Sequence, residues 1–174
     1  MKKTKNESEI LLSAPEIIGK GMLVTAGNTA DGFNCMTATW GGIGFLWKKN
    51  VFTFFIRPQR YTLGFAEKNE LITACFFDDS EKSKKILAYC GSHSGRDADK
   101  AKECSLTPIS VSDGKAVVFA EAEYSLVCRK LYVTDIKAED FADKTLLGNY
   151  EKGDFHRVFV CEIKDVAAKR TDSL

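Results

Sequence analysis

Residues 34–62 constrain the fold more than any other part of the chain. Their sequence is NCMTATWGGIGFLWKKNVFTFFIRPQRYT. Residues 51–56 are almost entirely apolar and rich in β-favouring side chains, which is typical of a strand buried on both faces. Pro58 ends that strand, because proline has no backbone N–H to donate to a neighbouring strand. The rest of the chain must therefore build a core around this strand.

The same segment carries the groups that a flat aromatic ligand with a phosphate would use. Small and hydroxyl side chains lie at residues 37–39, and the glycines after Trp40 let the backbone come close to a ring. Arg57 and Arg60 stand where a helix is predicted to begin, and arginines, hydroxyls and free backbone N–H groups attract phosphate. We therefore expect most of a flavin mononucleotide (FMN) site here. The alternative is a flexible loop with partly buried tryptophans and two surface arginines paired with acids.

Length and charge limit the classes of protein. The 174 residues suit one domain, and we expect a tail at residues 1–14 and a single domain over residues 15–174. The 25 basic and 24 acidic side chains give a formal net charge of +1, so charge gives no reason to expect nucleic acid or an anionic membrane surface as a partner. Residues 1–20 resemble a leader with a short docking segment at residues 10–18, whose apolar run is too short for a signal peptide. No apolar run reaches membrane length, and we expect a cytoplasmic protein.

Six cysteines are spread along the chain without a CxxC pair. In a chain of this length without a secretory signal, we interpret them as free thiols that mostly fill the core. The only close Cys/His pair is Cys90 with His93, and no second pair matches it. We therefore expect no zinc site and no other metal.

Turn signals and hydrophobic periodicity predict a mostly β protein with helices inserted in the middle. Residues 40–44 are too rich in glycine for a regular element, and residues 137–150 mix a short helix with loop. In residues 116–133, Glu121, Glu123 and Ser125 alternate with apolar residues and are expected on a wet face. Because helices do not alternate with strands, a mostly antiparallel sheet or barrel is favoured over a doubly wound sheet. The predicted strands are residues 22–26, 33–39, 51–56, 71–77, 116–133 and 155–166, and the predicted helices are residues 60–69, 80–89 and 94–104.

Two glycine-containing motifs need separate interpretation. The sequence GGIGFLW at residues 41–47 lacks the third small residue and the following helix of a dinucleotide fingerprint, so a Rossmann interpretation is rejected. Residues 90–97, CGSHSGRD, are predicted to form a loop that presents N–H groups to a phosphate and runs into a helix. The alternative there is a capping box at Ser94 and Asp97 with solvated charges. Neither His93 nor His156 has the partner spacing of a catalytic triad.

Three motifs in this order resemble the flavin reductase-like family of FMN-binding split barrels, and within it the flavoredoxin-type branch. They are NCMTATWGG at residues 34–42, FIRPQRYT at residues 55–62 and YCGSHSGRDADK at residues 89–100. The match in order and spacing covers about residues 15–166 and is weakest at residues 137–155. The resemblance implies a six-stranded antiparallel split β-barrel with flanking helices, usually a homodimer with FMN near the subunit interface.

The resemblance also implies a set of cofactor-binding positions. How they divide between ring and phosphate stays open at this point. His156 is the single catalytic candidate, as a group that orients an incoming nicotinamide or partner. The cofactor-binding positions are Asn34, Met36, Thr37, Ala38, Thr39, Trp40, Arg57, Arg60, Tyr61, Thr62, Gly91, Ser92, Ser94, Gly95, Arg96 and Lys100.

Three functions fit this interpretation. The first is an FMN-dependent oxidoreductase that uses NADH or NADPH and resembles a flavin reductase. The second is a flavoredoxin-like electron carrier that holds FMN, reacts poorly with nicotinamides and serves a small-molecule or protein acceptor. The third is a non-redox binding protein of the same shape. Both redox functions need the same FMN site, because the flavin supplies the chemistry and the protein supplies position, hydrogen bonds and charge.

Overall fold

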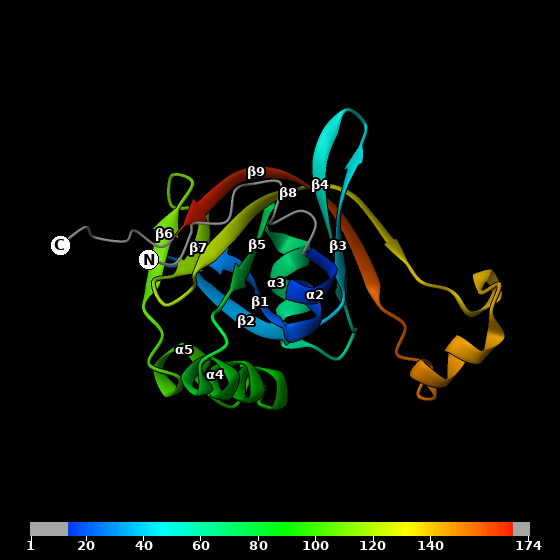
Figure 1. The fold of residues 1–174 in the computed structure, drawn as a ribbon, viewed down its shortest axis with the longest axis horizontal. Helices are drawn as coiled ribbons and strands as arrows, with labels where there is room; N and C mark the ends of the chain where they lie inside the picture. The colour runs from blue at the N-terminus through cyan, green and yellow to red at the C-terminus, as the bar shows by residue number, and fades with distance from the viewer. Residues whose placement is uncertain (1–13, 169–174) are drawn as a thin grey trace.

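The structure is a computed structural model that describes residues 14–168, and an open, curved antiparallel sheet dominates it (Figure 1). The main sheet has seven strands in the order β2-β1-β5-β8-β9-β4-β3. The predicted fold class is confirmed, although the sheet has one strand more than the six expected. The strands are β1 (Met22–Asn28), β2 (Gly32–Ala38), β3 (Gly41–Leu46), β4 (Lys49–Ile56), β5 (Leu71–Phe76), β8 (Tyr124–Asp135) and β9 (Arg157–Ala168).

The two edge strands of this sheet are close in sequence. β2 ends at Ala38 and β3 begins at Gly41, so the edges can be no further apart than this short connection allows. The sheet must therefore curl around on itself, and the long strands β8 and β9 arch over the top in Figure 1. Two register shifts in their pairing, at Val127/Cys128 and Lys130/Tyr132, help these strands to bend.

Helices lie on both sides of the curved sheet. α2 (Ala14–Lys20) and α3 (Tyr61–Lys68) pack against one part of the core, which includes Met36, Phe52 and Phe54. α4 (Glu81–Ser92) and α5 (Lys100–Glu103) cover the opposite face of β1 and β2, where Leu23 and Cys35 belong to a second cluster. Strand β2 thus separates the two halves of the core, since its side chains alternate between them.

Several local predictions were wrong. Residues 41–46 form strand β3 rather than an irregular segment, and the predicted helix at residues 94–104 shrinks to α5, preceded by a turn. The predicted strand at residues 116–133 is split into β7 (Ala116–Phe119) and β8, and β7 pairs with the unpredicted β6 (Pro108–Val111). Ser125, expected on a wet face, is buried against Cys75. Residues 14–20, assigned to a leader, form helix α2 with Ile18 in the core, while residues 1–13 lie outside the described part.

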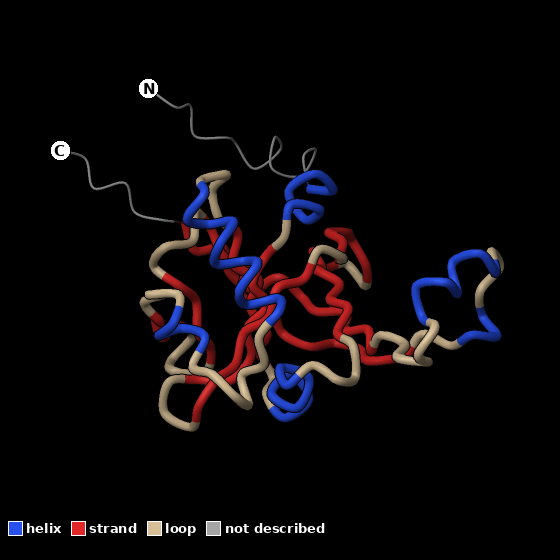
Figure 2. Tube along the Cα trace, turned by 90° about the horizontal axis from the view of Figure 1, so that it is seen from below, coloured by secondary structure: helices blue, strands red, loops and turns tan. Residues whose placement is uncertain are grey.

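A segment that we call the arm, residues 136–156, connects β8 to β9. It holds two 3₁₀ helices, η1 (Ala138–Asp140) and η2 (Lys144–Tyr150), which agrees with the predicted short helix and loop. The arm extends away from the sheet in both views (Figures 1 and 2). Within residues 14–168, no helix combines the length and apolarity needed to cross a membrane.

Candidate functional site

Residues 34–38 of strand β2 form the floor of two adjoining cavities. One, of about 300 Å³, lies over Asn34 and Met36 and is closed by the start of α3 and by residues 92–95. The other, of about 220 Å³, follows residues 36–40 to Phe55 and His156, and we call it the ring slot. The cavities share Met36 and Arg60, so together they form one elongated site of the size that small ligands occupy.

Arg60, which lines both cavities, and Lys100, which lines the first, bring two positive charges to a place that we call the anion site. The Arg60 Nη1 donates to the Gly91 carbonyl at 2.6 Å, and the Lys100 Nζ donates to the Cys90 carbonyl at 3.2 Å. The two carbonyls are consecutive in the last turn of α4, so one helix end holds both cations. Each cation keeps further donors for a ligand, because an ammonium has three and a guanidinium five.

No carboxylate within residues 14–168 lies within ion-pair distance of Arg60 or Lys100. Lys100 is only 5% exposed, and burial lowers the pKa of its ammonium. An uncompensated buried charge is costly, and a bound anion would remove that cost. The site therefore has the charge and the spare donors that a phosphate needs.

A close approach between residues 93–99 and strand β2 completes the anion site. A Cβ atom on Gly95 would lie 1.9 Å from the Oδ1 of Asn34 and 3.2 Å from the Tyr61 ring, so only glycine fits there. The Asn34 amide is held in place because it donates to the Thr62 hydroxyl at 2.7 Å. Arg96 lies over the Tyr61 ring, with its guanidinium carbon 4.7 Å from the centroid. The loop at residues 93–99 and the start of α3 thus pack together and form one wall of the site.

The far end of the ring slot is an aromatic cluster around His156. Its ring lies 4.9 Å from the Trp40 ring, and its Nδ1 is 3.0 Å from the Tyr150 hydroxyl. Burial, with the nearby Arg57 charge, lowers the pKa of His156 to about 4. The imidazole is therefore neutral at pH 7, which suits a hydrogen-bonding or stacking role better than that of a proton donor.

Arg57 is paired with an acidic residue, as the alternative interpretation expected of both arginines. It pairs with Asp154, donates to the Asn149 carbonyl at 2.9 Å and lies 5.2 Å from the Tyr150 ring centroid. The guanidinium in turn holds the pKa of Asp154 below its usual range. Arg57 thus fastens the arm to the ring slot, whereas Arg60 stays available to a ligand.

The structure brings the predicted site residues together. All of them line one of the two cavities except Gly91, whose carbonyl holds Arg60, and Arg96, which packs on Tyr61. Three details differ from the prediction. Gly91 and Ser92 belong to the last turn of α4 instead of a loop, and Arg96 and Lys100 do not share a helix. The Thr37 hydroxyl is turned to the other side of β2 and donates to the Leu87 carbonyl.

Sequence reasoning missed several residues of the site. Gln59, His93 and Phe55 line the cavities, and Asp154 and Tyr150 hold Arg57 and His156. The cavity residues could have been found, since Gln59 and His93 are next to predicted positions and Phe55 lies two residues before Arg57. The two arm residues gave one weak signal, an acid two positions before His156.

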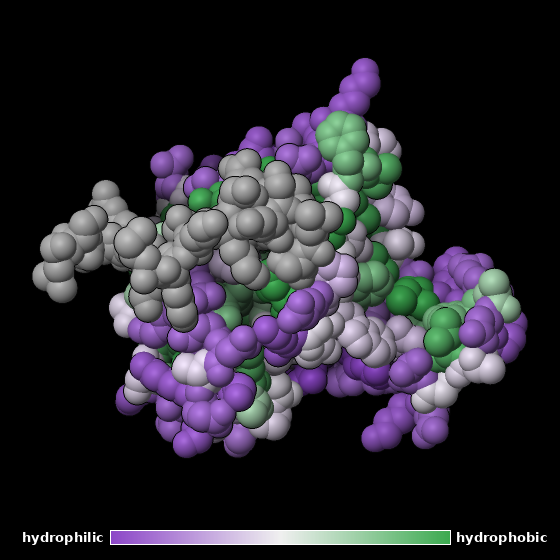
Figure 3. Space-filling view, in the orientation of Figure 1, coloured by the Kyte–Doolittle hydropathy of each residue, from purple (hydrophilic) through white to green (hydrophobic). Residues whose placement is uncertain are grey.

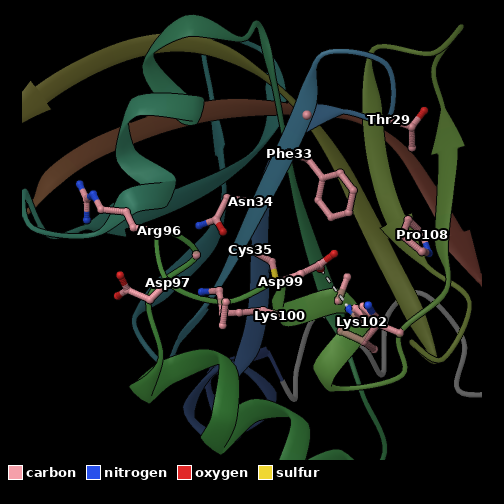
Figure 4. Close-up of a pocket in the computed structure, with 15 residues that line it drawn as sticks. Thr29, Phe33, Asn34, Cys35, Arg96, Asp97, Asp99, Lys100, Lys102 and Pro108 are labelled. Carbon is pink, nitrogen blue, oxygen red and sulfur yellow. Dashed lines mark hydrogen bonds between the residues drawn. The ribbon is translucent and has the colours of Figure 1, made fainter.

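A larger cavity, of about 680 Å³, lies on the other side of the same wall (Figure 4). Asn34, Gly95 and Lys100 line both it and the anion site. Asp97, Asp99, Lys102 and Cys35 also line it and are labelled in the close-up. Among the residues that the structure describes, no three His, Cys, Asp or Glu side chains gather into a metal site.

Comparison with known proteins identifies the family. The model of the flavin reductase like domain matches residues 17–174. A search of curated protein sequences gives no match. Flavoredoxin of Desulfovibrio vulgaris (Miyazaki F) has a similar structure, with a TM-score of 0.65, 21% identity and coverage of 88% of this chain and 74% of that one.

Two further solved structures share the fold at low identity. An FMN-binding protein from Thermus thermophilus gives a TM-score of 0.63 at 22% identity, covering 86% of this chain and 70% of that one. Nitrilotriacetate monooxygenase component B from Bacillus cereus gives 0.66 at 11% identity, covering 99% and 81%. At these identities the solved structures show only that the fold is shared. The match of the family model to residues 17–174 shows the family. The chain therefore belongs to the flavin reductase like domain family.

Proposed function

We propose that this protein binds FMN and transfers electrons through it. The observation that carries the proposal is the anion site, where Arg60 and the buried Lys100 face one cavity and donate to consecutive carbonyls of α4. Neither cation has a carboxylate partner in the part of the chain that the structure describes. That site adjoins a slot with an aromatic end, as a phosphate joined to a flat ring system requires. The matched family and the FMN-binding protein from Thermus thermophilus support the same ligand.

In this proposal Arg60, Lys100 and the Ser94 hydroxyl hold the phosphate, and Ser92, whose hydroxyl donates to the Ala88 carbonyl, lines the same cavity. Residues 36–40 would line the ring, with Trp40 and His156 at the end of the slot. FMN held in this way would supply the redox chemistry, which is the uptake of a hydride and the return of one or two electrons. The chain contributes fixed N–H groups along β2, a positive site that favours an anionic reduced ring, and a neutral His156 that orients an incoming molecule.

The electron donor in the proposal is NADH or NADPH, which makes the protein a flavin reductase-like enzyme. The alternative is an electron carrier that holds FMN without efficient nicotinamide oxidation, and the likeness to flavoredoxin favours considering it. Anaerobic mixing of the FMN-loaded protein with NADH or NADPH separates the two. Bleaching of the flavin spectrum within seconds supports the enzyme, and bleaching over many minutes supports the carrier. A protein that takes up no FMN refutes both.

The proposal includes a cytoplasmic homodimer that serves a small-molecule or protein acceptor. All six cysteines are unpaired, which suits a reducing compartment. Phe45 and Trp47 at the β3–β4 turn and Tyr132 on β8 are more than half exposed, and apolar side chains gather at this hairpin (Figure 3). A second copy would bury such a surface.

A further inference from the structure

Three of the six cysteines form a cluster between β2 and the helices that cover it. The Sγ of Cys90, in the last turn of α4, lies 4.0 Å from the Sγ of Cys35 on β2 and 3.8 Å from the Sγ of Cys104 after α5. Cys35 and Cys90 are buried, whereas Cys104 is partly exposed. The cluster thus runs from the floor of the site to the surface, and the proposed flavin chemistry makes no use of it.

Cys104 is reachable through its own cavity. This hollow of about 410 Å³ is also lined by Lys82, Lys85 and Tyr89 of α4 and by Glu103. Two lysines beside one carboxylate leave the opening positive, which favours a small anionic molecule. A negatively charged low-molecular-weight disulfide has both the reactivity and the charge for this opening.

We propose that Cys104 and Cys90 form a thiol modification site, at which a small anionic disulfide is exchanged for an internal Cys90–Cys104 disulfide. The Cys104 thiolate attacks one sulfur of the small disulfide, whose S–S bond breaks and releases one small thiolate. The Cys90 thiolate then attacks the Cys104 sulfur of the mixed disulfide and releases the second. The two protein thiols lose two electrons, and their two protons pass to the departing small thiolates.

The Cys90 and Cys104 sulfurs are close enough for a local movement to join them. The two sulfurs must move from 3.8 Å to about 2.05 Å, and Cys104 sits at the end of α5, which has only four residues. Burial raises the pKa of the Cys104 thiol to about 12, and the contact with Cys35 together with burial raises the pKa of Cys90 further, so little of either thiolate is present at pH 7. The exchange is therefore slow, on a scale of hours, and the pair stays reduced during brief exposure.

The position of Cys90 connects this modification to the anion site, and this step rests on the proposed function. The Cys90 carbonyl holds Lys100, and the next carbonyl along the chain, that of Gly91, holds Arg60. A disulfide would pull the last turn of α4 toward α5 and displace both carbonyls. FMN should therefore bind the oxidised protein about tenfold more weakly, the change expected when one charge-assisted hydrogen bond is lost.

Peptide mapping tests the site directly. The full chain, reduced and freed of reductant, is incubated overnight with oxidised glutathione, alkylated and digested with trypsin. Cys90 and Cys104 fall on separate peptides, residues 86–96 and 103–115, and Cys35 falls on residues 21–48. We expect a disulfide between the first two peptides. Dithiothreitol should reduce this disulfide, and the reduced protein should regain its affinity for FMN. Cys104→Ser and Cys90→Ala should each abolish the link, and Cys161→Ala, in the other half of the core, should keep it.

Three results would overturn the inference. Separately alkylated Cys90 and Cys104 after overnight exposure would refute the site, and a link from residues 86–96 to residues 21–48 would refute the assigned pair. A complete Cys90–Cys104 disulfide with unchanged FMN affinity would refute the coupling. If the protein bound no FMN at all, the proposed function would fail, and the peptide map would still decide the modification site.

Discussion

Arg60 is the residue whose side chain most directly connects the fold to the proposed ligand. Its guanidinium is fixed by the Gly91 carbonyl and has no carboxylate partner among the described residues. Arg60→Ala should weaken FMN binding by about tenfold to a hundredfold, since one charge-assisted contact contributes about 1.5–3 kcal/mol. Calorimetric titration with FMN measures this. The matched control is Arg129→Ala, which removes a guanidinium paired with Glu162 elsewhere on the sheet and should leave FMN affinity unchanged.

The Arg60 account has two specific ways to fail. Riboflavin affinity should be the same in Arg60→Ala and the wild type, because riboflavin has no phosphate. An equal loss for both ligands would show that Arg60 shapes the slot instead of binding phosphate. An apo variant with a collapsed thermal transition would show that the residue holds the fold together.

His156 should make stability depend on pH. Its folded-state pKa is lowered from 6.5 to about 4 by burial and the nearby Arg57, so between these values the unfolded chain binds a proton that the native chain does not. The free energy of unfolding should therefore fall as pH drops from about 6.5 toward 4, by up to about 1.4 kcal/mol per pH unit. His156→Asn should flatten this part of the curve in denaturant titrations. NMR titration gives the pKa itself, with His93→Gln to assign the second imidazole, and a His156 pKa near 6.5 would contradict the account.

At the scale of elements, two glycines that look alike in the sequence have different roles. Gly95 touches Asn34 and Tyr61, whereas Gly64 lies in the exposed face of α3 with open space around it. Gly95→Ala should push the loop off strand β2 and weaken FMN binding by at least about tenfold, the equivalent of one lost contact. Gly64→Ala should leave binding unchanged and stabilise the protein by about 0.4–1 kcal/mol, because alanine favours the helix. Thermal unfolding and FMN titration of both variants measure these effects. If Gly64→Ala weakened FMN binding more than Gly95→Ala, the assignment of Gly95 to the wall of the site would be refuted.

The elements that sequence reasoning predicted correctly are those determined by their own residues. The apolar run at residues 51–56 and the helix after Pro58 follow from local pattern and turn chemistry, and the structure contains both. Strand β3 could not be predicted in this way, because its glycines are required by contacts with the neighbouring strand β4. A Cβ on Gly41 would lie 3.1 Å from the Phe52 ring, so glycine permits close strand pairing there.

The same reason explains the wrong helix at residues 94–104. Local spacing suggested a capping box, but the contact of Gly95 with Asn34 bends the chain before α5 begins at Lys100. The predicted site residues did come together, because small, hydroxyl and basic side chains mark a phosphate site locally. The partners Asp154 and Tyr150 could not be predicted, since their contacts to Arg57 and His156 depend on how the arm folds back.

At the scale of the whole molecule, the exposed apolar hairpin predicts self-association. Phe45 is 73% exposed and Trp47 55% exposed at one end of the molecule. We expect a homodimer in sedimentation velocity, and FMN that touches both copies should stabilise it by about 2.7 kcal/mol for each site at a hundredfold excess over Kd. Phe45→Asp should shift the protein toward monomer. Ile109→Asp on β6, which changes another exposed apolar side chain on a separate hairpin, should not. A monomer at all concentrations would refute the dimer, and dissociation that ignores FMN would refute only the linkage.

The central claim is that Arg60 and Lys100 build a phosphate site at the end of a flavin slot. Titration of the purified apo protein with FMN and with riboflavin tests it most directly, because the two ligands share the ring and differ in the phosphate. With two charge-assisted contacts at stake, the account predicts that FMN binds at least about a hundredfold more tightly than riboflavin. Equal affinity for the two ligands would contradict it.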